Sequence, residues 1–245
     1  MAVVEPRVRN IAISEAVAQY GLYYALDPSS QIACTIGGNV AENSGGVHCL
    51  KYRLTVHNVE AIKILIIDGD ELNLSRQDEG LGLLALMNGS EGLLSIITEI
   101  TVKLTSTPEL ARVVMAGFDS VRDCANVVAD IIKVRIIPAG LEMMDSFAIE
   151  ATEGFAQVGY PLDAKALLLC ELDGTEQQVQ SELDKVLEIL SAASTLRVSA
   201  SEEEHLNLWE GRKFAFPAVG KIISWLLLYG RYNSKATFGR YVGKN

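Results

Sequence analysis

The segment DPSSQIACTIGGNVAENSGGVHCLKYR, Asp27 to Arg53, carries two Gly-Gly pairs within ten residues, at positions 37–38 and 45–46. Glycine is used where φ is positive or where another group approaches the backbone closely. Hydroxyl and amide side chains flank the pairs: Ser29, Ser30, Thr35, Asn39 and Asn43. These neutral donors suit an anionic diphosphate held in a backbone nest. Composition alone leaves a second interpretation open, a glycine-rich surface loop.

Two well-known phosphate-binding loops are excluded by their sequence patterns. The chain contains no GxxxxGK[ST], the pattern of a P-loop. It also contains no GxGxxG between a strand and a helix, the fingerprint of a Rossmann dinucleotide site. A nucleotide site in this chain therefore has a different architecture.

Three motifs together resemble the FAD-linked oxidases of the vanillyl-alcohol-oxidase type. They are the segment above, LMNGSEGLLSIITEITVKL at 86–104 and PAGLEMMD at 138–145. The family includes the FAD-binding subunits of bacterial glycolate oxidases and the D-lactate and D-2-hydroxyglutarate dehydrogenases. The resemblance extends from about Val3 to about Lys221. It implies oxidation of a 2-hydroxy acid with FAD as cofactor, with glycolate as the first substrate and D-lactate or another D-2-hydroxy acid as the alternative.

The resemblance also implies roles for particular residues. It places the flavin against Pro28, Ser29, Ser30, Thr35, Gly37, Gly38, Asn39, Asn43, Gly45 and Gly46, with Ile96 and Ile97 at its adenosine end. Ser90 and Glu91 are further candidates unless GSEG is simply a tight turn. Arg212, in LWEGRK, matches the family arginine that pairs with the substrate carboxylate, for which a planar guanidinium is well shaped. No catalytic base and no metal ligand is assigned.

Charge and cysteine content limit the partners and the compartment. The formal net charge is -10, which argues against nucleic acid or an anionic membrane surface as a partner. No apolar run is long enough for a membrane span and no secretion signal is evident, so we expect a cytoplasmic protein. The four scattered cysteines are expected to be small buried residues. The resemblance implies a complex with an iron–sulfur subunit and a second flavin-type subunit.

Hydrophobic patterns predict an α+β chain in three parts. Residues 1–107 are expected to form the later part of a FAD-binding domain. The segment 61–68 and residues 71–74 are predicted to form a hairpin around Asp68-Gly69, and 96–104 a buried strand. A helix is predicted over 10–20. Residues 108–221 are expected to form part of a cap domain, and residues 222–245 a divergent tail.

The pattern after Pro108 predicts a ferredoxin-like layer. Strands are expected over 112–118, 140–144 and 166–172. Helices are expected over 120–134, with Val121, Ala125, Val128 and Ile132 on one face, near 147–158, and over 176–193, with Val179, Leu183, Val186 and Leu190 on one face. Asp119 or Ser120 is the expected N-cap of the first of these helices.

Several features depart from the family pattern. The family carries another glycine-rich loop before the matched region and a histidine-rich motif after it, and we expect this chain to lack both. The tail after Lys221 has four basic residues and no acidic one, which indicates either a frameshift product or a genuine divergent terminus. These features favour a second hypothesis, a catalytically inactive remnant or an interaction module. Arg7 and Arg53 stand where the family usually has glycine, at a cost of about 1 kcal/mol each if φ is positive there.

The histidines are few. His48 lies beside the glycine pairs and either contacts the flavin or is satisfied locally, His57 follows nine residues later, and His205 follows three glutamates on a face expected to be solvated.

Overall fold

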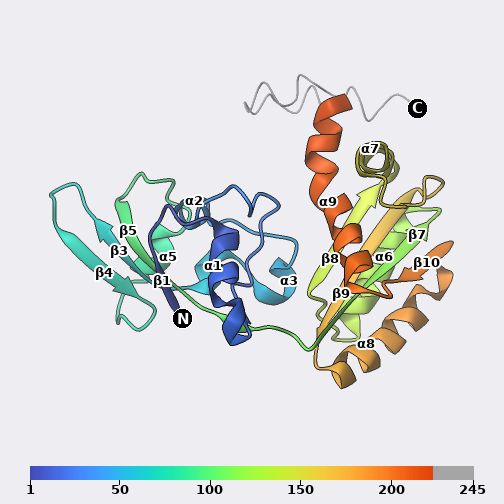
Figure 1. Ribbon diagram of the computed structural model, residues 1–245, viewed down its shortest axis with the longest axis horizontal. Coiled ribbons are helices and arrows are strands. Elements are labelled where there is room, and N and C mark those ends of the chain that lie inside the picture. The colour runs from blue at the N-terminus through green and yellow to red at the C-terminus, as the bar shows by residue number, and fades with distance from the viewer. Residues whose placement is uncertain (223–245) are drawn as a thin grey trace.

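The computed structural model describes residues 1–222, and its strands form two four-stranded sheets and one short strand pair. Figure 1 shows the two sheets in separate lobes, joined by the segment that leads from β5 to β7. The first lobe contains these elements: β1 (Ala2–Val4), α1 (Asn10–Val17), a 3-10 turn (Ala18–Tyr20), β2 (Leu22–Tyr23), α2 (Ile36–Glu42), α3 (Cys49–Tyr52), α4 (Thr55–Asn58), β3 (Val59–Leu65), β4 (Glu71–Ser75), α5 (Leu83–Met87), β5 (Ile96–Val102) and β6 (Thr105–Ser106).

The first sheet has the order β1-β5-β3-β4 and is antiparallel throughout. The predicted hairpin is confirmed, because β3 pairs with β4 across a turn in which Gly69 has φ 87°. Ile62, Ile64 and Ile100 are fully buried beneath the helices of this lobe. The expectation of a buried strand over 96–104 is wrong at its beginning, because the Ile96 side chain is 66% exposed.

The glycine-rich segment is partly helical rather than a loop. Gly37 and Gly38 lie in the first turn of α2, whose N-cap Thr35 accepts a hydrogen bond from the Gly38 N–H at 3.2 Å. None of the four paired glycines has a positive φ. A Cβ on Gly37 would lie 2.7 Å from Pro6, and one on Gly46 would lie 2.5 Å from the Asp27 carbonyl oxygen. At these two positions glycine is needed because the chain's own backbone approaches closely.

The second lobe has the strand order of a ferredoxin-like fold. Its antiparallel sheet runs β10-β7-β9-β8, and β7 pairs with β9 over nine residues, which confirms that 112–118 and 166–172 share a sheet. The elements of this lobe are β7 (Leu110–Phe118), α6 (Val121–Lys133), β8 (Gly140–Asp145), α7 (Ser146–Ala156), β9 (Ala166–Gly174), α8 (Glu176–Ile189), a 3-10 turn (Leu190–Ala192), β10 (Thr195–Val198) and α9 (Glu202–Ile222).

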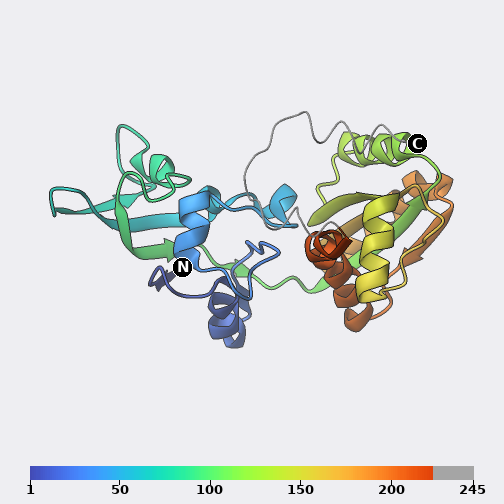
Figure 2. The same cartoon turned by 90° about the horizontal axis from the view of Figure 1, so that it is seen from above.

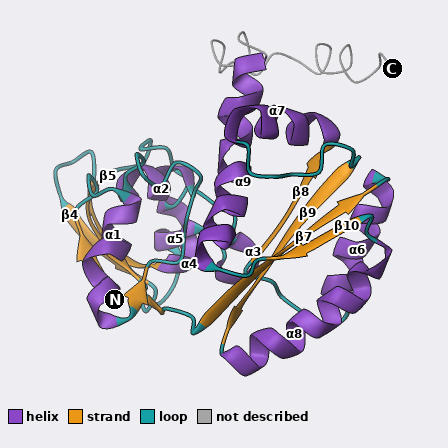
Figure 3. Ribbon diagram, turned by 45° about the vertical axis from the view of Figure 1, so that its right-hand side comes forward, coloured by secondary structure: helices purple, strands orange, loops and turns teal. Residues whose placement is uncertain are grey.

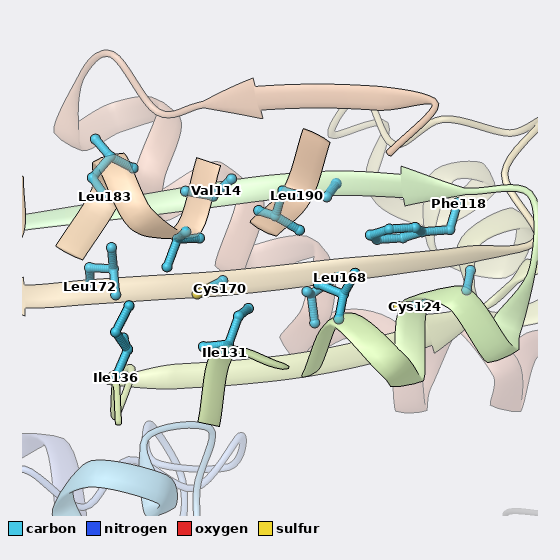
Figure 4. Close-up of a cluster of buried hydrophobic side chains, with 14 of the residues drawn as sticks. Val114, Phe118, Cys124, Ile131, Ile136, Leu168, Cys170, Leu172, Leu183 and Leu190 are labelled. Atoms are coloured by element: carbon cyan, nitrogen blue, oxygen red, sulfur yellow. The ribbon is translucent and has the colours of Figure 1, made fainter. Parts of the chain in front are cut away.

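Helices cover both faces of this second sheet, as Figure 3 shows. Side chains of β7 and β9 alternate, so that one set packs against α6 and α8 and the other against α7 and α9. Figure 4 shows the first set, in which Val114, Phe118, Leu168 and Leu172 meet Ile131 and Leu183. The helix over 176–193 buries the four residues predicted for it.

The prediction for α6 has the right span and N-cap but the wrong face. Ser120 caps the helix by accepting a hydrogen bond from Asp123 N–H. The buried residues are Cys124, Val127 and Ile131, whereas the predicted Val121 and Ile132 are exposed. Apolar residues are adjacent in the sequence at 127–128 and at 131–132, so two neighbouring faces of the helix both show an apolar residue at helical spacing. The turn after β7 sets the orientation of the helix and so decides which face packs on the sheet.

A short segment connects the two lobes. β6 pairs with β2 of the first lobe, and the N–H of Thr107 donates to the carbonyl of Gly21. Pro108 and Glu109 then lead directly into β7. Among the described residues, no helix combines the length and apolar character required to cross a membrane. The tail expected over 222–245 lies outside the described residues, apart from its first position at the end of α9.

Candidate functional site between the two lobes

One side of α9 carries His205, Trp209, Arg212 and Lys213. Their spacing of four, three and one residues places them on one side of a helix. Trp209 and Lys213 contact His48 and Asp27 of the first lobe. His205 and Arg212 pair with Glu171 and Glu142 of the second sheet. Figure 2, in which α9 is seen end-on, shows it on the side of the second lobe that faces α3. The helix therefore lines the junction between the two lobes.

A buried ionic cluster occupies this junction. His48 Nδ1 lies 2.9 Å from Asp27 Oδ2, and His48 Nε2 lies 3.1 Å from Glu171 Oε2 on β9. His205 Nε2 approaches the same Glu171 oxygen at 3.3 Å, and Lys213 Nζ lies 3.7 Å from Asp27 Oδ2. The His48 ring thus lies between two carboxylates, each of which also contacts a basic side chain of α9. We call Asp27, His48, Glu171, His205 and Lys213 the junction cluster.

The charges of the junction cluster stabilise one another. Burial alone lowers the pKa of His48, but hydrogen bonds to the Asp27 and Glu171 carboxylates outweigh it and raise the pKa to about 10. Burial alone raises the pKa of Glu171, but hydrogen bonds from His205 and His48 outweigh this effect and lower the pKa to about 2. At neutral pH His48 is therefore a fixed cation that does not accept a proton.

A second contact between the lobes lies beside the cluster. Lys51 Nζ donates to the Asp173 carbonyl oxygen at 2.6 Å and to its carboxylate, and the Tyr52 hydroxyl donates to the same carboxylate. Burial and this hydrogen bond to Asp173 raise the pKa of Tyr52 well above its ordinary value, so it stays protonated. These residues attach the end of α3 to β9.

Arg212 lies next to the junction cluster and is held by Glu142. Its Nε and Nη2 both donate to Glu142 Oε2, at 3.0 and 2.8 Å. The two side chains are about one-quarter exposed, so Arg212 is neither free in solvent nor sealed in the core. Because both bonds go to one carboxylate oxygen, the guanidinium retains N–H groups for a further acceptor.

Comparison with protein-family models identifies both lobes. Residues 1–75 match the model described as "FAD binding domain", and residues 107–230 match the model described as "FAD linked oxidases, C-terminal domain". The chain belongs to the FAD-linked oxidase family. The family resemblance drawn from the sequence motifs is thereby confirmed, and FAD is the cofactor of this family.

The relatives of this FAD-linked oxidase include glycolate oxidase subunits. It is 56% identical over 224 residues to glycolate oxidase subunit GlcD of Escherichia coli, covering 89% of this chain and 45% of that protein. The subunit GlcD of Bacillus subtilis is 37% identical over 227 residues, covering 90% of this chain and 48% of that protein. A D-lactate dehydrogenase of Anaerostipes hadrus is 31% identical over 84% of this chain and 46% of its own length. The chain therefore spans about half the length of these relatives.

A solved structure supports the same fold. An alkyldihydroxyacetonephosphate synthase superposes with a TM-score of 0.74 over 90% of this chain and 43% of that one, at 19% identity. The likeness supports the α+β architecture predicted above, in which a vanillyl-alcohol-oxidase-type domain is followed by a ferredoxin-like layer.

Some of the residues predicted to contact the flavin serve the chain's own fold. Asn39 is buried and accepts a hydrogen bond from the Asn10 amide at 2.9 Å. Asn43 ends α2 at φ 47° and accepts from the Val56 N–H. Gly45 packs against Cys49, and Ile97 packs into the apolar core of the first lobe. Pro28 is buried.

Others remain open, and they fit a flavin nucleotide. Ser29, Ser30 and Gly38 are exposed, and Thr35 is half-buried beside them. A Cβ on Gly38 would contact only the Thr35 hydroxyl, so this glycine leaves space that the fold itself does not require. The exposed hydroxyls of Ser29 and Ser30 are suitable donors to a diphosphate, whereas the Gly38 N–H already donates to the Thr35 hydroxyl. Ile96, at the far end of the sheet, is exposed as well.

The GSEG motif is a tight turn in this structure. Gly89, Glu91 and Gly92 all have positive φ, and the Glu91 N–H donates to the Ala41 carbonyl. The turn therefore supports α2 from behind, and Ser90 and Glu91 are explained without a ligand.

Two further expectations need correction. His205 is not on a solvated face, since its side chain is only 16% exposed and contacts Glu171.

Cys124 and Cys170 are buried, as expected, and burial raises their pKa values to about 11 and 12, but Cys34 and Cys49 are only half-buried. Cys49 accepts a hydrogen bond from the Gly46 N–H at 2.8 Å.

Sequence reasoning missed the acidic members of the site: Asp27, Glu142, Glu171 and Asp173. The last two interrupt the apolar run ALLLCELDG of β9, and an acidic side chain within a buried strand requires a cationic partner. That interruption was the available signal. The partners from the first lobe, His48 and Lys51, are more than 120 residues away, so the pattern could not identify them.

Proposed function

We propose that this chain forms the later part of the FAD-binding domain and part of the cap of a 2-hydroxy-acid oxidase. Its preferred substrate in this proposal is glycolate, which is oxidised to glyoxylate. The observation that carries the proposal is the position of Arg212. Its helix neighbour Lys213 contacts Asp27, the first residue of the glycine-rich segment. A carboxylate-binding arginine and a diphosphate-binding segment therefore meet at one junction.

The residues assigned to the cofactor are Ser29, Ser30 and Thr35 through their hydroxyl groups, and Gly38 leaves space beside them. Bound FAD supplies the acceptor for the hydride that leaves the substrate carbon. The remaining assigned residues, including Asn39, Asn43 and the other glycines, shape the segment by packing and hydrogen bonding within the chain.

Arg212 is assigned to the substrate carboxylate. Glu142 fixes the orientation of the planar guanidinium through its bonds to Nε and Nη2. The remaining N–H groups of Arg212 therefore point in fixed directions within that plane. A carboxylate held by a fixed guanidinium has its hydroxyl-bearing carbon in a defined position. Trp209, which is 4% exposed, excludes water from the adjoining side of the His48 ring. His48 keeps protons on both ring nitrogens, and the carboxylates of Asp27 and Glu171 balance its charge.

The relatives named as glycolate oxidase subunits support assembly into a larger complex. We propose an iron–sulfur subunit and a second flavin-type subunit as the partners, which would accept electrons from the reduced flavin. We also propose that the protein acts in the cytoplasm. Small 2-hydroxy acids are its substrate class.

The experiment measures FAD binding and glycolate oxidation by the purified chain, alone and with candidate partner subunits. FAD binding is followed by quenching of flavin fluorescence, and oxidation by reduction of an artificial electron acceptor. We expect Arg212→Lys to raise the KM for glycolate at least tenfold while FAD binding is unchanged. Arg122→Gln, at an exposed position on α6, is the control and leaves both unchanged.

Each outcome distinguishes a hypothesis. FAD binding with turnover of D-lactate in preference to glycolate would replace the substrate but keep the reaction. An absence of both FAD binding and turnover, with and without partners, would support the inactive remnant or interaction module instead.

A further inference from the structure

A basic groove of about 580 Å³ lies on the first lobe, beside the segment that leads to the second lobe. Its lining includes Lys51, Arg53, His57, Arg76, Lys103 and Thr105, and no acidic side chain. None of the residues predicted to contact the flavin lines it. A groove without a carboxylate is notable in a chain with net charge -10, because acidic residues outnumber basic ones by 31 to 21.

The basic side chains of the groove fall into two groups. Lys51 is bound to Asp173, and Arg76 donates to the Val59 carbonyl at 2.9 Å and lies 3.5 Å from Glu60. Arg53, His57 and Lys103 are exposed, and none of them has an ion-pair partner within residues 1–222. Three cationic or titratable groups therefore face one concavity without a counterion from the described chain.

The backbone that carries these three residues is fixed by one buried amide. Asn58 Nδ2 donates to the Tyr52 carbonyl at 2.8 Å and to the Leu54 carbonyl at 3.0 Å. The Asn58 carbonyl accepts from the Lys103 N–H at 2.8 Å. Asn58 thereby joins the backbone on both sides of Arg53 to the backbone of Lys103, and His57 is its neighbour.

Arg53 occupies this position at a conformational cost. Its backbone has φ 68° and ψ -167°, a region that is almost confined to glycine. Backbone strain of this kind is found most often at ligand-binding positions, where the surrounding structure holds it in place. The family usually has glycine at this position, so the conformation belongs to the fold, and this chain adds a charged side chain to the groove there.

We propose that this groove binds a phosphorylated small molecule through Arg53, His57 and Lys103. A phosphate group carries up to two negative charges and several acceptor oxygens, which matches three separate donors better than a single carboxylate does. The volume is typical of small-molecule sites. The Thr105 hydroxyl lies in the same lining and is available to a phosphate oxygen. This proposal is independent of the oxidase activity.

The probe is inorganic pyrophosphate, and the measurement is isothermal titration calorimetry of the full chain at fixed low salt. We expect saturable binding by the unchanged protein and at least a tenfold higher Kd for the double variant Arg53→Gln with Lys103→Gln. The matched control is Arg122→Gln with Lys185→Gln, which removes the same charges at exposed positions of α6 and α8 and leaves the Kd unchanged. A cooperative thermal unfolding transition of each variant is the check that it is folded.

A further variant separates the groove from the flavin-binding segment. Gly38→Asp introduces a negative charge beside Thr35, so it should abolish FAD binding but leave pyrophosphate binding unchanged. If Gly38→Asp abolishes pyrophosphate binding and the double variant does not, the anion lies in the flavin segment and the proposal is wrong. It is also overturned if the unchanged protein binds no pyrophosphate, or if a glutamate-rich peptide displaces it with a lower Kd, since the groove would then be a protein-docking surface.

Discussion

In β9 of the second sheet eight of nine residues are buried, whereas in β5 of the first sheet only two of seven are. The second sheet lies between α6 and α8 on one face and α7 and α9 on the other, so both sets of alternating side chains are covered. The first sheet is covered on one face, and Val3, Leu72 and Ile96 remain exposed on its strands. Apolar packing covers both faces of the second sheet, while the first lobe supplies the partners of the buried Glu171 and Asp173 at the junction.

The largest effect is expected in the core of the second sheet. Leu168 is fully buried between β9 and the helices α6 and α8, so Leu168→Ala should lower the free energy of unfolding by about 4 kcal/mol. Urea unfolding followed by circular dichroism measures it. If the free energy of unfolding falls by less than about 1 kcal/mol, this face of the second sheet is not the tightly packed core described above.

The junction should respond next. Glu171→Gln removes the carboxylate that contacts His48 and His205 and leaves the buried His48 cation without one of its two carboxylate partners, at a cost of about 3 kcal/mol. Chemical unfolding with probes in each lobe would show whether the two transitions separate. Glu188→Gln, at an exposed position of α8, is the control and should change stability by less than about 0.5 kcal/mol.

The pH dependence of the junction follows from the same groups. The folded pKa of His48 is raised from 6.5 to about 10, so its contribution is complete below pH 6.5 and is lost as the pH rises toward 10. The folded pKa of Glu171 is lowered from 4.5 to about 2, so its contribution is complete above pH 4.5 and is lost as the pH falls toward 2. Both contribute fully between about pH 4.5 and 6.5. Unfolding midpoints across pH 3–9 would test this, and a stability that rises steadily from pH 6.5 to 9 would contradict it.

A smaller effect of the opposite sign is expected at Arg53. Arg53→Gly relieves the strain at φ 68° and should raise the free energy of unfolding by about 1 kcal/mol, after allowance for the greater freedom of glycine in the unfolded chain. Arg53→Ala, which retains the strained conformation, is the matched control. Equal stabilisation by both variants would attribute the effect to charge instead. Arg7 has no positive φ, so its expected cost is absent.

The smallest effect is expected on the open face of the first sheet. Ile96→Thr retains a β-branched side chain at an exposed position and should change stability by less than about 0.5 kcal/mol. The same change at Ile100, fully buried on the same strand, should cost more than 2 kcal/mol. A large loss at Ile96 would show that this face is covered in the folded protein.

Local patterns predicted the elements of the fold better than the residues of the site. Helix α8 has a single apolar face, which the sequence identifies correctly. Helix α6 has two adjacent apolar faces, and the sequence does not tell which of them is buried. The paired glycines correctly marked a close backbone approach at Gly37 and Gly46, but the approaching groups are Pro6 and Asp27. The junction cluster depends on contacts between segments more than 120 residues apart, and no local period encodes such pairing.

The pairing of β6 with β2 has a consequence for how firmly the lobes associate. Because Leu22 and Tyr23 hold Ser106 and Thr105, only residues 107–109 separate the anchored end of the first lobe from β7. A tether this short keeps the facing surfaces at an effective concentration on the order of millimolar or above. Contacts that two separate molecules would form with a Kd of about 1 mM are then populated for a large share of the time. The short tether therefore favours reassociation of the facing surfaces and keeps the two lobes in register.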